Sequence, residues 1–241
     1  ASAVSSTSSP SGNEALTVLN PDAGRWYVTV VNRSLEVMDS RVTATVDAQA
    51  PVVRPGGYFN PARGGHGLFV YPASSEWVGL WYTYLQDGTP TWYYLQGPEP
   101  GANGQWSPTV FRSAWNGSIN RLVPVGSATA TPGAADAFTF SYTLDGETGS
   151  EAFNGFGRGC PAVAGRVVNA SSHWYDPIRS GTGYSVQMFP NYEFYLVFGY
   201  DGMGVPRFLV AERGSMGGAS ETLNLEQLTG ACPLCARSGN P

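Results

Sequence analysis

The fold is decided by a phrase that occurs twice, first as Tyr58-Phe59-Asn60-Pro61-Ala62-Arg63-Gly64-Gly65-His66-Gly67 and then as Trp174-Tyr175-Asp176-Pro177-Ile178-Arg179-Ser180-Gly181-Thr182-Gly183. The two copies are 174 − 58 = 116 residues apart. The same offset places residues 84–92 on residues 200–208 without a gap. The chain therefore contains an internal repeat, with one copy over residues 57–161 (copy one) and a second over residues 165–233 (copy two).

Composition predicts an all-β fold. The 241 residues include 31 Gly and 18 Pro, and Phe, Trp and Tyr make up 13% of the chain. Many turn formers together with many aromatic residues are typical of short strands joined by tight turns. No window shows helical periodicity. We expect antiparallel meanders that form β-sandwich or barrel-like units.

The repeat also predicts the domain organisation. Residues 1–14 are Ser-rich and are expected to be flexible, residues 15–48 form a three-strand unit, and residues 49–56 are a Pro-bounded linker. The closing phrases of the copies, Gly159-Cys160-Pro161 and Ala231-Cys232-Pro233, are only 232 − 160 = 72 residues apart. Copy two thus lacks 116 − 72 = 44 residues, and we expect two incomplete meanders to pack on each other.

Two resemblances bear on cellular context. The pattern Val18-x-Asn20-Pro21-x-Ala23-Gly24-x-Trp26-Tyr27-Val28 resembles the closing strands of the bacterial pre-peptidase C-terminal domain, a β-sandwich appended to secreted peptidases. This resemblance implies an exported, non-catalytic region. The repeat itself is similar to an uncharacterised repeat of secreted bacterial proteins. This resemblance implies no particular activity.

Charge and cysteine usage restrict the function further. The net charge of −5 and the lack of basic clusters argue against a nucleic-acid partner, and no apolar run predicts membrane insertion. Low charge with many Ser, Thr, Gly and aromatic residues suits a secreted bacterial protein, located outside the cell or at its surface. Of the three cysteines, we expect Cys232 and Cys235 to form a local disulfide and Cys160 to stay a thiol.

The duplicated phrase itself is interpreted as a turn rather than an active site. An Asn or Asp before proline favours a local turn, glycines supply positive φ, and an arginine can hold the loop. Such chemistry must recur wherever the turn recurs. The structural turn residues are Asn60, Pro61, Arg63, Gly65 and Gly67 in copy one and Asp176, Pro177, Arg179, Gly181 and Gly183 in copy two.

Signals of catalysis are weak. The two histidines, His66 and His173, are not equivalent in the repeat, and no Gly-x-Ser-x-Gly elbow is present. Cys232-x-x-Cys235 lacks further zinc ligands nearby. We therefore predict no catalytic residue, metal or cofactor, and a hydrolase that uses His66 is the weakest alternative.

Aromatic residues carry the functional prediction. Leu80, Tyr82 and their copy-two equivalents are apolar in both copies, which indicates a core face, whereas the alternate positions differ between the copies. Exposed Trp and Tyr rings stack on sugar rings. A patch binding polysaccharide or a surface glycan is the first hypothesis, and a second aromatic packing layer is the alternative. The second functional hypothesis is a structural or adhesive surface subunit that self-associates through strand edges. The proposed glycan-binding residues are Trp77, Trp81, Tyr93, Trp106 and Trp115.

Overall fold

The computed structural model describes residues 29, 41–43, 51–133, 136–157, 162–163, 166–167, 169–190, 192–214 and 222–235. The chain divides into two compact units, residues 1–47 and 48–241. The predicted three-strand unit over residues 15–48 lies outside the described residues apart from residues 29 and 41–43, as does Cys160. The described part of the second unit contains strands and no helix, which confirms the predicted all-β fold class. No helix among the described residues is long and apolar enough to cross a membrane.

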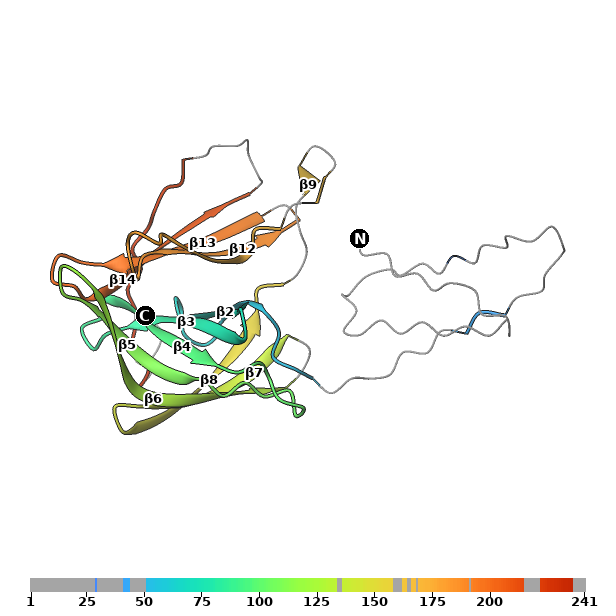
Figure 1. Ribbon diagram of the computed structural model, residues 1–241, viewed down its shortest axis with the longest axis horizontal. Coiled ribbons are helices and arrows are strands. Elements are labelled where there is room, and N and C mark those ends of the chain that lie inside the picture. Colours follow the sequence, from blue (N-terminus) through green and yellow to red (C-terminus); the bar gives the residue numbers. More distant parts are fainter. Residues whose placement is uncertain are drawn as a thin grey trace. The chain divides into compact units, whose positions relative to one another are not determined.

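Copy one is a closed eight-stranded antiparallel barrel (Figure 1). Closure is made by β1, which pairs with β2 on one side and with β8 on the other. The expectation of an incomplete meander is wrong for this copy, because residues 147–155 add a strand that closes the sheet. The eight strands are β1 (Gly56–Phe59), β2 (Gly67–Ala73), β3 (Glu76–Tyr84), β4 (Pro90–Gly97), β5 (Thr109–Trp115), β6 (Asn120–Pro132), β7 (Ala137–Leu144) and β8 (Glu147–Gly155).

Copy two is an open four-stranded antiparallel sheet, equivalent to half of the barrel. Each of its strands begins and ends 116 residues after a strand of copy one, as in 172 − 56 = 116 for β11 and β1. Two short paired strands, β9 (Ala162–Val163) and β10 (Arg166–Val167), precede it. The four strands are β11 (Ser172–Tyr175), β12 (Gly183–Phe189), β13 (Tyr192–Tyr200) and β14 (Pro206–Arg213).

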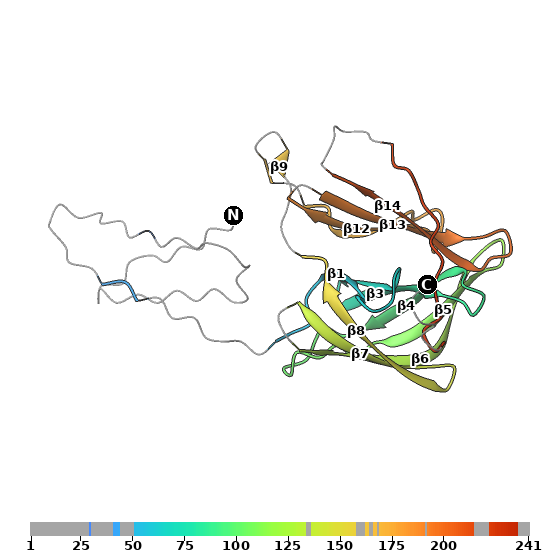
Figure 2. The same ribbon diagram turned by 180° about the vertical axis from the view of Figure 1, so that it is seen from behind.

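The sheet packs on the outside of the barrel, against β2, β3 and β4, as Figures 1 and 2 show from opposite sides. Successive side chains of a strand point to opposite faces. The outward face of β3 presents Leu80, Tyr82 and Tyr84, which are buried against Phe198 and Phe208 of the sheet. The face that is apolar in both copies is therefore the interface between them.

Buried hydrogen bonds fix how the sheet sits on the barrel. The Tyr82 hydroxyl lies 2.6 Å from Ser185 Oγ, and the Tyr71 hydroxyl donates to the Val186 carbonyl at 2.8 Å. The backbone N–H of Gly57 donates to Gln187 Oε1 at 2.9 Å. Buried polar groups need such partners, so these contacts favour a single register between the two layers.

The duplicated phrase forms the same tight turn in both copies: turn 1 (residues 60–66) and turn 2 (residues 176–182). Gly65 has φ of 74° and Gly181 has φ of 77°, a conformation that favours glycine. A Cβ on Gly65 would lie 1.7 Å from the Tyr84 hydroxyl oxygen, and one on Gly181 would lie 2.1 Å from that of Tyr200. Each turn is thus closed over a tyrosine from the third strand of its own copy.

Candidate functional site

The predicted aromatic patch is not a surface feature. Trp81 and Trp106 are fully buried inside the barrel, and Tyr93 is buried beside them. Trp77 is half-buried and packs on the same core. Barrel closure causes this, because it turns the variable face of β3 inward. Gly79 leaves the space that the Trp106 ring fills, since a Cβ there would lie 2.8 Å from that ring.

Trp115 lies apart from the other four rings. It is half-buried at the end of β5, where it stacks on Tyr200 with ring centroids 6.2 Å apart. Its backbone N–H donates to the Gly204 carbonyl at 3.0 Å. The five residues therefore form no common platform, and the burial of three of them corrects the prediction of an exposed patch.

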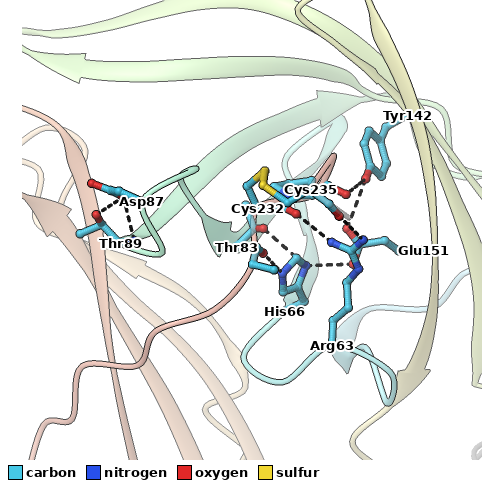
Figure 3. Close-up of a disulfide and its surroundings, with 11 residues drawn as sticks. Arg63, His66, Thr83, Asp87, Thr89, Tyr142, Glu151, Cys232 and Cys235 are labelled. Carbon is cyan, nitrogen blue, oxygen red and sulfur yellow. Dashed lines mark hydrogen bonds and ion pairs between the residues drawn. A yellow bond between two sulfur atoms is a disulfide. The ribbon is translucent and has the colours of Figure 1, made fainter. Parts of the chain in front are cut away.

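His66, the residue of the weak hydrolase alternative, belongs to a buried polar cluster beside the disulfide (Figure 3). His66 and Glu151 are both buried, and Nδ1 lies 3.0 Å from Oε2. Asn60 donates from Nδ2 to the same oxygen at 2.7 Å. The other ring nitrogen, Nε2, lies 2.7 Å from the Ala231 carbonyl. A carbonyl oxygen only accepts, so Nε2 is the donor in the contact with Ala231.

A disulfide loop covers this cluster. Cys232 and Cys235 form the expected disulfide within the loop of residues 231–235. Arg63 donates to the Cys232 carbonyl at 2.8 Å and to the Cys235 carbonyl at 3.1 Å. Both nitrogens of the His66 ring thus have protein partners. Together, His66 and Arg63 hold the disulfide loop on the barrel.

Tyr142 completes the anchor from the opposite side of the barrel end (Figure 3). Its hydroxyl donates to the Pro233 carbonyl at 3.1 Å. Burial, together with the nearby Glu151 carboxylate, raises the pKa of Tyr142, so the phenol keeps its proton. Among the described residues, no group of three or more His, Cys, Asp or Glu side chains could hold a metal ion.

An open apolar groove lies on the outer face of the copy-two sheet, and sequence reasoning missed it. Trp174 is 53% exposed and Tyr184 is 50% exposed, and these two residues pair across β11 and β12. The groove has a volume of about 320 Å³. We call it the aromatic groove, and its lining residues are Ala170, Trp174, Tyr184, Val186, Met188, Tyr195 and Leu223.

Two of the groove's rings are held in place by hydrogen bonds. The Trp174 indole N–H donates to the Ala170 carbonyl at 2.8 Å. The Tyr195 hydroxyl donates to Glu193 Oε2, which also accepts from Arg213 Nε at 2.6 Å. Burial and the Glu193 hydrogen bond raise the pKa of Tyr195 to about 12. Rings fixed in advance lose little freedom when a ligand binds.

A comparison of the copies explains why this face is open. Trp174 and Tyr184 occupy the positions of Tyr58 and Leu68, which are buried in the barrel core. Copy two has no equivalents of β5–β8 among the described residues, so Trp174 and Tyr184 stay half exposed, whereas Met188 on the same face is buried. The sequence contained a signal of this exposure. Core residues of copy one, Tyr58 and Leu68, are replaced by the larger aromatic residues Trp174 and Tyr184 in copy two.

The chain matches no protein-family model, no curated protein and no solved structure. Its function is therefore argued from the geometry of the groove.

Proposed function

We propose that the chain is a non-catalytic accessory region of an exported protein and binds a polysaccharide or surface glycan in the aromatic groove. One observation carries the proposal: two half-exposed rings, Trp174 and Tyr184, stand side by side over an open apolar groove. Large aromatic surfaces are usually buried, and exposed apolar patches with polar rims mark binding sites.

The chemistry of the groove suits a sugar. The C–H face of a pyranose ring is apolar and packs on an aromatic ring, while its edge needs hydrogen bonds. Three of the lining residues, Trp174, Tyr184 and Tyr195, carry an N–H or O–H group beside an aromatic ring. The volume of about 320 Å³ is at the lower end for small-molecule pockets, which favours contact with one or two sugar rings of a longer chain.

The test is retention on a panel of insoluble polysaccharides, followed by affinity electrophoresis with the glycan that retains the chain. We expect Trp174→Ala and Tyr184→Ala each to weaken binding roughly fivefold or more, since each removes a stacking surface. Tyr175→Ala is the matched control, because Tyr175 is 74% exposed but follows Trp174 on the strand and so points to the other face. No retention on any glycan, or equal losses in all three variants, would refute the proposal.

A second candidate function is self-assembly through a strand edge, as in a structural or adhesive subunit. β1 has a neighbour on both sides, whereas β11 pairs only with β12 among the described strands. An unpaired edge can accept another strand. Light scattering over a concentration series tests this function, with Tyr175→Pro removing an edge N–H. A strict monomer at high concentration would exclude it.

A further inference from the structure

Turn 1 acts as a receptor for a peptide segment of the same chain. The Arg63 guanidinium donates to two backbone carbonyls of the disulfide loop, at 2.8 Å and 3.1 Å. His66 adds a third contact, from Nε2 to the Ala231 carbonyl at 2.7 Å. A forked guanidinium suits this task, since it can reach two acceptors in fixed geometry. The receptor thus recognises a compact peptide turn by its carbonyl oxygens.

Turn 2 has the same backbone and presents its arginine from the same position. The Arg179 N–H donates to the Asp176 carbonyl at 3.0 Å, as Arg63 N–H does to Asn60 at 3.2 Å. The N–H of Thr182 donates to the Arg179 carbonyl at 3.2 Å, the same distance as in turn 1. Turn 2 therefore repeats the backbone of turn 1 and carries an arginine at the same position.

Beside turn 2, where the disulfide loop would lie if the two copies were alike, there is a pocket of about 230 Å³. Its lining includes Asp176, Arg179, Thr182 and Val197, which are the repeat equivalents of Asn60, Arg63, His66 and Trp81. The Arg179 side chain is 79% exposed. Among the described residues, the pocket is lined only by turn 2 and by strands of copy two.

We propose that turn 2 binds a peptide turn of a partner protein, in the way that turn 1 binds the disulfide loop. The chain's own loop does not serve, because Arg63 and His66 already hold it. Asp176 lies 3.8 Å from Arg179 and offsets its charge, so neutral carbonyls fit the pocket better than an anion. Val197 in place of Trp81 leaves room for an apolar side chain of the peptide. This site is distinct from the aromatic groove, although Tyr184 lines both.

The probe is a synthetic peptide with the sequence of residues 229–236, closed by its disulfide, blocked at both ends and labelled for fluorescence anisotropy. We expect saturable binding to the full chain. Arg179→Gln should weaken it about tenfold or more, because it removes the two charged donors. Arg121→Gln, a change to an exposed arginine on β6, is the matched control and should leave binding unchanged.

A gain of function sharpens the test. Thr182→His gives turn 2 the second donor of turn 1, so we expect it to bind the peptide several-fold more tightly. Trp174→Ala, which damages the groove, should leave peptide binding intact, so failure of the glycan proposal is separable from failure of this one. Lack of saturable binding, binding that is insensitive to Arg179→Gln, or no gain in Thr182→His would each overturn the peptide site.

Discussion

Copy one and copy two use the same four strands and the same turn, but one face of those strands has opposite environments in the two copies. In copy one, β5–β8 close the barrel and this face becomes a core of buried rings. In copy two, the equivalent face carries Trp174 and Tyr184 at the surface. The two copies of a duplicated unit can therefore share an interface and a turn although only one of them is closed into a barrel.

The largest expected contrast comes from one pair of equivalent positions, Trp81 and Val197. Trp81→Ala empties the centre of the barrel and should lower the free energy of unfolding by about 3–5 kcal/mol. Val197→Ala, on the outer face of the sheet, should cost less than about 1 kcal/mol. Urea unfolding measures both. Similar losses at the two positions would mean that the copy-two face is also a core.

The next effect concerns Glu151, a buried carboxylate on β8, a strand without an equivalent among the described residues of copy two. Glu151→Ala leaves His66 and Asn60 without their shared acceptor and should destabilise the chain by about 3 kcal/mol. Glu147→Ala is the matched control, because Glu147 is exposed on the same strand. Equal melting temperatures for the two variants would contradict the role of Glu151.

A smaller effect should follow loss of the disulfide. Replacing both Cys232 and Cys235 by Ala opens a very short loop, for which the chain-entropy model gives about 2 kcal/mol. Hydrogen exchange should rise at turn 1, which binds this loop, and stay unchanged at turn 2. Faster exchange at both turns would show that the two copies unfold together rather than separately.

The smallest expected effect is a pH dependence that originates in copy two. Burial lowers the pKa of His173 to about 4, so the folded chain keeps this ring neutral at a pH where the unfolded chain protonates it. Stability should therefore fall as the pH drops from about 6.5 toward 4. His173 is only half-buried, which reduces the energy expected from this pKa difference, so we expect a loss on the order of 1 kcal/mol. His173→Gln should flatten the profile in this window, and an unchanged profile would assign the dependence to other groups.

The repeat made the fold class, the turns and the interface predictable, because these features depend on local pattern. β8 was missed because Glu151 stands where strand alternation calls for an apolar residue, and its partners His66 and Asn60 are distant in sequence. Closure was missed for a related reason. Copy two holds no equivalents of β5–β8 among the described residues, so comparing the copies could not show that Trp81 faces inward.

The groove was missed because exposure was assigned to the wrong copy. A ring that replaces a core residue, as Tyr184 replaces Leu68, indicates burial only when the rest of the core is present. A larger aromatic residue at a core position of the shorter copy is thus a signal of an exposed ring, because that copy has no equivalents of β5–β8 among the described residues.

The disulfide loop also has a consequence for the order of folding. Arg63 and Cys232 are 169 positions apart, so the barrel end is closed by contacts of very high sequence separation. A ribosome makes β1–β8 well before it makes residues 231–235, and non-local contacts of this kind slow folding. If the barrel forms on the nascent chain, the contacts of His66 and Arg63 with residues 231–235 are the last to be added at this end.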